Sequence, residues 1–591
     1  MEETLKKQKF SVYNIIFIIV VIAQLIFLSV SFAVNNTAHH EDEYFSYGLA
    51  NSQNRVYLYG SALQVPDNYD VWMTGDDFKY YIETNEESRF SYDTVWKNQA
   101  ADTHPPLYYA VLHTICSFFP NQFSWWWAFG INLFCFAVTQ VFLYKFFSRF
   151  AKSQLAGVIV CIYWGLSLGG QSNVYFLRMY MMLTMFAVMY AYFSQTVLTA
   201  EGKIPLKQFI FVGLTAFLGA LTQHNFLVFA FMYTLIQCVV LLIKKRVKDC
   251  FAYGGSAAVG VGLSIAAFPA TIAHMFSTEM HWSGEIDPAI QRYQYLRVIV
   301  RNMTGYIMNF FEMNYYADVI AIILCVLVVL AAACFVCRKE KWFIPIAEKC
   351  KNALRTLWTN FKKADLSPIM IFAASELVFE IVVHKVYIYD LELDSVRYFY
   401  IFLPLVIGVF ISWIYVIGTH ISKKICTPVI CVALAALLVY QNVRITPTYV
   451  LSDSPENGTV SSYVKGQNCV VLVSSPIFLP CYCTMLADTN NDYITPYVNC
   501  EFEAHADEYK KLYENGEDFY VLFDTNKIAE KKTDENSNAL TYDYIIDYFE
   551  DISGYKATYC TQQREHYMDV RLYKFEKQAE NNFIFPSPGG L

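Results

Sequence analysis

An apolar N-terminal segment is followed closely by His39-His40-Glu41-Asp42-Glu43, a run of side chains that could act as acids, bases or ligands. Three carboxylates in a row must be hydrated or paired, because an unpaired buried charge is costly. A solvated loop edge explains the run as well as a catalytic role does. We treat Asp42 and Glu43 as candidate catalytic groups.

A second polar cluster leads into a proline pair, in Asp102-Thr103-His104-Pro105-Pro106-Leu107. Because the prolines fix the local backbone, Asp102 and His104 would be held in a defined orientation. Asp102 could instead be simply the N-cap of the helix that follows. His224, in the short turn Gln223-His224-Asn225, is a further candidate for substrate binding.

Two arginines lie beside apolar segments, Arg178 close to Tyr180 and Arg397 next to Tyr398. An arginine at the edge of a membrane span needs a partner, and a lipid phosphate suits its planar fork of donors. A snorkelling side chain explains Arg178 equally well. A structural pair with Asp394 explains Arg397.

The elements that must position these residues are membrane helices. Of the 591 residues 55% are hydrophobic and 16% are charged, whereas an average soluble domain has about 25% charged residues. A block of about 20 apolar residues crosses the hydrocarbon core. We predict about eleven spans on this criterion, at 12–33, 124–147, 155–169, 177–198, 208–222, 225–243, 252–274, 317–337, 368–386, 398–418 and 426–441.

The loops between these spans differ in charge. Every second loop is basic: those with Lys6, Lys7 and Lys9, with Lys145, Arg149 and Lys152, with Lys203 and Lys207, with Lys244–Lys248, with the tract Arg338–Lys363, and with Lys423 and Lys424. The positive-inside rule makes that side cytoplasmic. We therefore expect a multi-pass protein of the plasma membrane, with a cytoplasmic N-terminus and with all the polar clusters above on the external side.

Two apolar stretches could be assigned in more than one way. Leu107–Phe119 has only about 13 residues, too few to cross a membrane, and counting it as a span would reverse every later loop. We predict an interfacial helix there, within a first external loop at 34–123. The run Ile15–Val34 is too long for the apolar core of a signal peptide, so it is predicted to be an uncleaved first span.

The C-terminal segment, residues 442–591, has a different composition. It contains 23 acidic and 12 basic residues, a net charge of −11 in a chain whose net charge is −8. Strand-like runs occur at Cys469–Ser474, Phe519–Phe523 and Val570–Phe575, and helix-like stretches at Glu503–Asn515 and Ala539–Phe549. The predicted division is a transmembrane module at 1–441 and an external α/β domain at 442–591.

Cofactor chemistry is weakly indicated. Cys481 and Cys483 form a C-x-C without a second pair at zinc-ribbon spacing, which argues against a metal there. The disulfide state of the C-terminal cysteines is left open, namely Cys469, Cys481, Cys483, Cys500 and Cys560. No cofactor is implied with certainty, and a divalent metal without assigned ligands is compatible with the acidic groups. No basic and aromatic pattern indicates binding to nucleic acid.

At these polar clusters the chain resembles the multi-spanning glycosyltransferases that use lipid-linked sugars. More narrowly, it is similar to the superfamily of dolichyl-phosphate-mannose protein mannosyltransferases and bacterial aminoarabinose transferases, which have the GT-C fold. The resemblance rests on the acidic pair Asp42-Glu43 followed by His104-Pro105-Pro106-Leu107, and more weakly on Arg178-x-Tyr180 and on Arg397-Tyr398 before Pro404. It covers about residues 1–420.

The resemblance implies that a sugar moves from a polyprenyl-phosphate donor to an envelope lipid, glycan or protein, with inversion at the anomeric carbon. It implies Asp42 as the general base, with Glu43 beside it and Asp102 as a further catalytic candidate. The substrate-binding residues would be His104, Arg178, Tyr180, His224, Arg397 and Tyr398. Such a displacement needs a base at the acceptor hydroxyl and positive charge at the departing phosphate, which these residue types supply.

Two other functions are considered. A transporter or flippase for a lipid-linked substrate would show inverted repeats and charges at mid-membrane, but no repeat is visible and the main charges within a span are Glu376, Glu380, His384 and Lys385. A non-catalytic scaffold would leave the acidic pair and the His-Pro-Pro-Leu element unexplained. The loop after His274 is too short for the β-trefoil domain of eukaryotic protein mannosyltransferases, so protein O-mannosylation is not implied.

Overall fold

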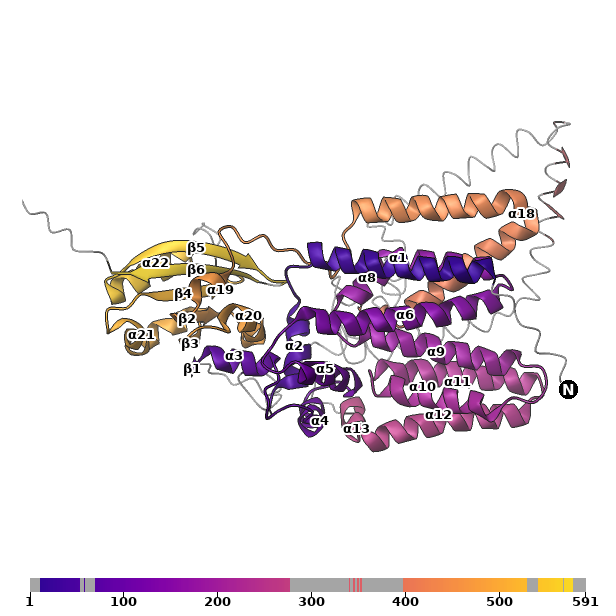
Figure 1. Cartoon of the computed structure of the whole chain (residues 1–591), viewed down its shortest axis with the longest axis horizontal. Coiled ribbons are helices and arrows are strands. Elements are labelled where there is room, and N and C mark those ends of the chain that lie inside the picture. The colour runs from indigo at the N-terminus through magenta and orange to yellow at the C-terminus, as the bar shows by residue number, and fades with distance from the viewer. Residues whose placement is uncertain are drawn as a thin grey trace, which may run out of the picture. The chain divides into compact units, whose positions relative to one another are not determined.

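A computed structural model of the chain describes residues 11–53, 70–276, 397–528, 540–566 and 568–577, with isolated positions at Leu58 and between 340 and 355. The predicted spans 317–337 and 368–386, and Asp394, lie outside these residues. The chain forms two compact units, each assembled from separate segments (Figure 1). Unit 1 comprises Met1–Ala33, Thr103–Tyr108 and Trp125–Val450, and unit 2 comprises Val34–Asp102, Tyr109–Ser124 and Leu451–Leu591.

Unit 1 is built of apolar helices (Figure 1). Among the described residues, six helices are long and apolar enough to cross a membrane, or seven if one bent pair counts as a single span. The chain is therefore a multi-pass membrane protein, as its composition predicts. The helices are α1 (Val12–Asn35), α6 (Trp125–Phe150), α7 (Gln154–Leu166), α8 (Leu168–Tyr175), α9 (Tyr180–Thr199), α10 (Leu206–Ala220), α11 (Asn225–Ile243), α12 (Val247–Ala267), α13 (Ala270–Phe276) and α18 (Leu403–Arg444).

Two predicted spans are each divided into two helices. The span predicted at 155–169 is the pair α7 and α8, which meet at 59°. Ser167 lies at the break, where its hydroxyl oxygen accepts a hydrogen bond from the Gly170 N–H at 3.1 Å. The span predicted at 252–274 is likewise divided, into α12 and α13, because Pro269 has no N–H to continue the helix.

The two predicted spans at 398–418 and 426–441 both belong to α18. This helix turns back on itself, so that its two legs run in opposite directions (Figure 1). The second leg, Lys423–Arg444, meets the length and hydropathy of a membrane span, whereas the first leg, Leu403–Thr419, is shorter. The described ends of the other predicted spans agree with the structure to within a few residues.

Close packing in unit 1 depends on small and amide side chains. At the contact of α10 with α12, a Cβ on Gly260 would overlap the carbonyl oxygen of Gly213, so the glycine permits the close approach. Between α1, α6 and α7, Gln140 Nε2 donates to Gln24 Oε1 at 2.8 Å and Gln24 Nε2 donates to the Cys161 carbonyl at 3.0 Å. Such buried amide bonds join helices within a bilayer.

Unit 2 combines the loop after α1 with the C-terminal segment. The loop contributes α2 (Glu41–Asn51), β1 (Val71–Met73), α3 (Gly75–Ile82), α4 (Tyr92–Ala101) and most of α5 (Leu107–Phe118). The C-terminal segment contributes α19 (Val460–Val464), β2 (Asn468–Val473), η2 (Pro476–Tyr482), α20 (Cys483–Leu486), β3 (Asn491–Pro496), η3 (Val498–His505), α21 (Ala506–Tyr513), β4 (Phe519–Asp524), α22 (Tyr542–Ser553), β5 (Lys556–Arg564) and β6 (Asp569–Glu576). The predicted all-α membrane part with a C-terminal α/β region is therefore confirmed.

A six-stranded mixed sheet forms the centre of unit 2, in the order β1-β3-β2-β4-β6-β5. Strand β2 is parallel to both β3 and β4, while β6 and β5 form an antiparallel hairpin beside β4. The edge strand β1 comes from the loop after the first helix, and Trp72 pairs with Tyr493 of β3. The loop and the C-terminal segment were predicted to be separate parts of the chain, so this strand was not predicted.

The two faces of the sheet are covered by different elements. One face packs against α21 and α22 through a core that includes Leu472, Phe519 and Phe549. On the other side, α2 contacts η2 and α3 contacts α20, so helices of the loop pack on elements of the C-terminal segment. Gly48 of α2 lies against the Tyr81 ring of α3, where a Cβ would overlap the ring.

Asp492 of β3 gives unit 2 a predicted dependence on pH. Burial raises the pKa of this carboxyl from 3.8 to about 7, against the hydrogen bond it accepts from the Thr489 hydroxyl. The folded state then binds more protons than the unfolded state between about pH 4 and pH 7, so this carboxyl makes unfolding easier as the pH rises through that range.

We expect the thermal unfolding midpoint of the detergent-solubilised chain to fall less between pH 5 and pH 8 in Asp492→Asn than in the wild type. The amide keeps an oxygen for the Thr489 hydroxyl and cannot ionise. Asp488→Asn is the control, because hydrogen bonding to Lys79 lowers the pKa of that exposed carboxyl. Parallel pH profiles for the wild type and Asp492→Asn would contradict the prediction.

Candidate functional site

The acidic run after α1 forms the first turn of α2. His40 is the N-cap, and its Nδ1 accepts a hydrogen bond from the Asp42 N–H at 3.0 Å. Glu43 completes a capping box, because its carboxylate accepts from the His40 N–H at 3.3 Å and contacts His39 Nδ1 at 2.9 Å. The N-terminal end of α2 is thus fixed by its own sequence, and carboxylates there also interact favourably with the helix dipole.

The hairpin between β5 and β6 packs on this turn within unit 2. Glu565 accepts hydrogen bonds from the His39 N–H at 2.7 Å and from the Tyr44 hydroxyl at 3.1 Å. The His566 N–H donates to the His39 carbonyl at 3.2 Å. The position of α2 is therefore set by residues at the other end of the chain.

Burial changes the ionisation of two carboxyl groups in this region. It raises the pKa of Glu565 to about 8, although the hydrogen bonds from His39 and Tyr44 favour the ionised form. Burial also raises the pKa of Glu41 to about 7, with a further increase from the neighbouring Asp42 charge and a decrease from His566. Both groups therefore titrate near neutral pH, which is typical of functional sites and also of buried structural groups.

The three consecutive carboxylates have different surroundings. Glu41 lies 3.2 Å from His40 Nδ1 and 3.9 Å from His566 Nδ1, and Glu43 is fully buried in the capping box. Asp42 is only partly buried. Its backbone N–H is used in the cap, and its backbone carbonyl accepts from the Ser46 hydroxyl at 3.1 Å.

Histidines from both segments complete a set of side chains that could hold a metal. The rings of His40 and His566 stack with their centroids 4.4 Å apart. Together with Glu41 they offer three ligand atoms within 4.8 Å of one another.

Asp102, the third catalytic candidate, caps a different helix from the one expected. It is the C-cap of α4, where its N–H donates to the Asn98 carbonyl at 2.9 Å. The interfacial helix α5 begins only at Leu107, so Asp102 is not its N-cap. The sequence could not distinguish a C-cap of α4 from an N-cap of α5, because α4 ends and α5 begins within six residues. Asp102 itself is 8% exposed, and its catalytic role stays a prediction.

In unit 1, Arg178 lies in the short connection between α8 and α9. This connection is held by Asn132 of α6, whose Nδ2 donates to the carbonyls of Val174 at 2.9 Å and Phe176 at 2.8 Å. The Arg178 N–H donates to the Phe176 carbonyl at 2.7 Å, and the residue is 4% exposed. Arg178 is therefore a buried arginine on a fixed backbone, and the alternative of a solvent-reaching side chain does not describe it.

The second arginine segment meets the first within unit 1. The Arg397 guanidinium lies 5.9 Å from the ring centroid of Phe176 and 5.4 Å from that of Tyr398. The Tyr398 ring in turn is 6.1 Å from the ring of Tyr180, edge to face. Residues that lie more than two hundred positions apart in the chain thus bring the Arg397 guanidinium and the rings of Tyr180 and Tyr398 together near Phe176. Arginines among tyrosines suit an anionic headgroup.

His104 and His224 belong to another part of unit 1. The Leu107 N–H donates to the Leu221 carbonyl at 3.0 Å, which brings the proline-containing element next to the turn before α11. His104 Nδ1 is 3.3 Å from the Thr103 hydroxyl, and His224 Nε2 is 3.3 Å from His274 Nδ1. The hydrogen bond from Leu107 to Leu221 therefore places the segments that carry His104 and His224 in one region of unit 1.

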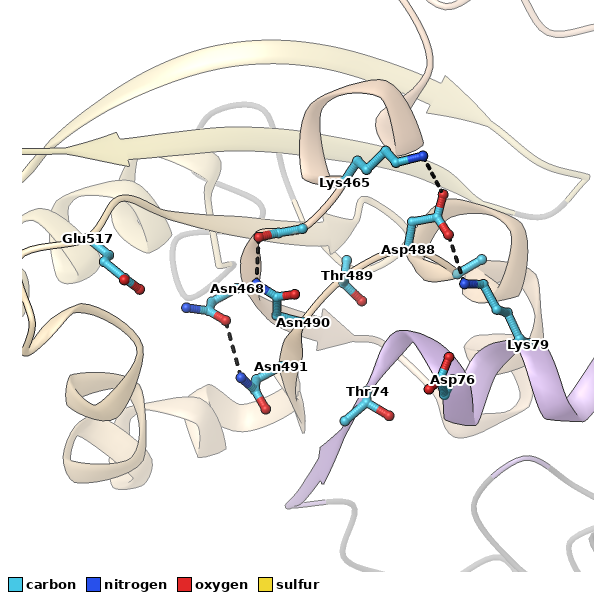
Figure 2. A pocket seen from close by; sticks show the side chains of 12 residues that line it. Thr74, Asp76, Lys79, Lys465, Asn468, Asp488, Thr489, Asn490, Asn491 and Glu517 are labelled. Carbon is cyan, nitrogen blue, oxygen red and sulfur yellow. Dashed lines mark hydrogen bonds and ion pairs between the residues drawn. The ribbon is translucent and has the colours of Figure 1, made fainter.

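Unit 2 also has a polar pocket of about 690 Å³ that the sequence did not predict (Figure 2). Loop residues Thr74, Asp76 and Lys79 line it together with C-terminal residues. Lys79 and Lys465 both pair with Asp488, at 2.8 Å and 3.3 Å (Figure 2). The remaining labelled residues are polar as well: Asn468, Thr489, Asn490, Asn491 and Glu517. Such a lining can donate hydrogen bonds to a hydroxyl-rich ligand and accept hydrogen bonds from it.

Glu565 and His566 are the residues that sequence reasoning missed. The dipeptide lies between two strands of an α/β domain that carries no familiar motif, and nothing near it in the sequence indicates a partner at His39 or His40. The only local signal is an acidic residue beside a histidine in a hairpin turn, which is common on protein surfaces. The C-terminal thiols of Cys469, Cys481, Cys483 and Cys560 are buried, and that of Cys500 is half-buried.

No protein-family model matches the chain, and no curated protein sequence matches it. Among solved structures, the chain is similar to ArnT from Cupriavidus metallidurans in the apo state, with 10% identity and a TM-score of 0.45 over 95% of this chain and 97% of that chain. It is also similar to ArnT from the same organism bound to undecaprenyl phosphate, with 10% identity and a TM-score of 0.40 over 95% and 98% of the two chains. These similarities are distant, and they assign no activity to the chain.

Proposed function

We propose that the chain is a membrane glycosyltransferase that moves a sugar from a polyprenyl-phosphate carrier to an envelope lipid, glycan or protein. The transfer takes place on the external side of the membrane and inverts the anomeric carbon. The observation that carries the proposal is the meeting of Arg178-x-Tyr180 with Arg397-Tyr398 in unit 1. Both segments are parts of the sequence resemblance, which implies that they bind the donor.

Asp42 is the proposed general base. Its neighbours in the acidic run have structural contacts of their own, Glu43 in the capping box and Glu41 with two imidazoles. Asp42 is held on a fixed helical turn and is not fully buried, which suits a group that must meet an acceptor hydroxyl. Its backbone is fixed before the substrate arrives, so little reorganisation is needed.

Arg178 and Arg397 are the proposed ligands of the donor phosphate. In an inverting transfer the carrier phosphate leaves with the bonding electrons, so positive charge near it stabilises the transition state. The aromatic rings of Phe176, Tyr180 and Tyr398 line the same place and would pack against the isoprenoid portion next to the phosphate. This combination explains why arginines lie among buried apolar residues.

The acceptor and the sugar are identified first, by mass spectrometry of envelope lipids and glycans from a deletion strain beside its parent. We expect one glycoform to disappear and the unmodified acceptor to accumulate. Its return on complementation with the wild-type chain supplies the assay for the variants below. An unchanged envelope with an altered distribution of the lipid-linked sugar across the membrane would favour a flippase instead.

Asp42→Asn is expected to reduce turnover by about a hundredfold or more, the usual scale for the loss of a general base. Expression and donor binding should stay as in the wild type, since the amide retains the shape of the side chain. Asp93→Asn is the matched control, because Asp93 is an exposed carboxylate of α4 in the same loop and forms an ion pair with Lys97 at 3.1 Å. Full activity of Asp42→Asn would make Glu43 or Asp102 the next candidate.

Arg178→Lys is expected to weaken the use of the donor partially and Arg178→Ala severely, because lysine keeps the charge but loses the planar fork. The change should appear in the kinetic constants for the donor and not in the apparent affinity for the acceptor. Arg149→Lys is the control, since Arg149 is another arginine of unit 1, and its guanidinium lies over the Tyr192 ring at 5.1 Å. If Arg178→Ala leaves donor kinetics unchanged, the phosphate is bound elsewhere, with His104 and His224 as the next candidates.

The proposed orientation is tested with single cysteines at exposed positions. Lys248 lies in the first turn of α12 on the predicted cytoplasmic side, and Asn515 lies after α21 on the predicted external side. An impermeant thiol reagent should label Asn515→Cys in sealed cells and label Lys248→Cys only after the membrane is opened. Both are compared with the parent chain to subtract its native cysteines. The reverse pattern would invert the topology and remove the external site.

A further inference from the structure

The side chains of His40, Glu41 and His566 form a compact group where α2 meets the β5–β6 hairpin within unit 2. Each offers one ligand atom, and these atoms lie within 4.8 Å of one another. Two of the residues come from the first turn of α2 and one from the other end of the chain. In the part of the chain that the structure describes, no other three residues of these types come together in this way.

We propose that His40, Glu41 and His566 bind a divalent metal ion of the Zn²⁺ type. Two imidazoles and one carboxylate are a ligand set found for zinc, with a fourth position left for water or another ligand. A mixed nitrogen and oxygen set favours such an ion over Mg²⁺ or Ca²⁺, which prefer oxygen ligands throughout. The inference does not depend on the proposed transferase activity.

His40 presents an unprotonated ring nitrogen to Glu41. Its Nδ1 accepts from the Asp42 N–H at 3.0 Å, so this nitrogen carries a lone pair and not a proton. The same nitrogen lies 3.2 Å from Glu41 Oε2. A proton on the carboxyl group or a metal ion would offset the repulsion between these two acceptor atoms. A metal ion at Nδ1 would use the same lone pair, so it would replace the hydrogen bond from the Asp42 N–H.

The position of His566 favours the metal over the proton. A shared proton needs only His40 and Glu41, yet the His566 ring stacks on the His40 ring with centroids 4.4 Å apart, and its Nδ1 is 3.9 Å from the same Glu41 oxygen. Two ligand atoms about 2.1 Å from a tetrahedral ion are about 3.4 Å apart. Since the three atoms lie within 4.8 Å of one another, the widest pair would need to approach by at most about 1.4 Å to share one ion.

The backbone near His566 already holds this side chain in place. The Glu565 carboxyl accepts from the His39 N–H at 2.7 Å, and the His566 N–H donates to the His39 carbonyl at 3.2 Å. Two hydrogen bonds thus align the hairpin with the residue that precedes His40. A bound ion would add a third connection between the two segments and would fix the turn that carries Asp42.

The test uses the full chain, purified in detergent with an affinity tag that contains no histidine. The protein is stripped with a chelator, reloaded with Zn²⁺, freed of excess ion and analysed for metal per chain. We expect about one Zn²⁺ per chain and a rise of about 5 °C in the unfolding midpoint on reloading, because an ion that binds only the folded state stabilises it.

The variants His566→Gln and Glu41→Gln should each lose at least about tenfold in Zn²⁺ affinity, and the reloading shift should disappear. Both keep hydrogen-bonding side chains, and the His566 backbone bond is unaffected. His505→Gln is the matched control, because His505 is a histidine of unit 2 whose contacts are with Asp70 at 3.0 Å and Tyr493 at 3.1 Å. It should bind Zn²⁺ as the wild type does.

Two outcomes would overturn the proposal. One is a wild-type chain that retains no Zn²⁺ after removal of excess ion, which would leave a shared proton as the cation. The other is equal retention in the wild type, His566→Gln and Glu41→Gln, which would place the ion elsewhere. The wild-type measurement decides the first outcome even if a variant fails to fold.

Discussion

The carboxyl group of Glu565 is the constraint on which unit 2 depends. It is fully buried, and it accepts one hydrogen bond from the backbone of His39 and one from the hydroxyl of Tyr44. A buried carboxyl without partners would destabilise the fold. The loop after the first helix therefore has to lie against the hairpin to satisfy it. Through this group, residues at opposite ends of the chain become parts of one structure.

The local order around Asp42 follows from that constraint. The capping box fixes α2 from within, and Glu565 and His566 fix it from outside, so that the first turn of the helix has little freedom. Burial then distinguishes the three neighbouring carboxylates. Glu41 lies near two imidazoles and its pKa is raised to about 7, Glu43 is buried in the cap, and Asp42 is half-buried. A run that looks uniform in the sequence thus contains three different chemical environments.

The sequence predicted those parts of the fold that depend on local patterns. Apolar blocks of sufficient length gave helices such as α1, α6 and α11, and apolar runs gave β2 and β4. The short strand β1 was not predicted because three residues carry no periodicity, and β3 was not because it contains polar residues and ends at Pro496. The break at Ser167 was missed because hydropathy is insensitive to the direction of a helix.

Of the residues of the candidate site, the sequence likewise predicted some and missed others. Asp42, Arg178 and Arg397 could be singled out because each stands beside a span, where charged residues are unusual. Glu565 and His566 stand beside strands of a water-soluble type of domain, where charged residues are ordinary. Their importance comes only from a contact with residues more than five hundred positions away, and no property of the nearby sequence encodes such a contact.

The same long-range contacts determine when unit 2 can fold. The loop is synthesised early, yet β1 pairs with β3, and the first turn of α2 packs on a hairpin close to the C-terminus. Contacts between distant segments form late, because the entropy of closing the loop opposes them until the partner is present. The capping box is the local structure that needs no distant partner, so α2 can begin to form as soon as the loop has left the ribosome. The packing that fixes the orientation of α2 has to wait for the last strands. The Asp42 carboxylate on α2 is therefore held in its final surroundings only in the complete chain.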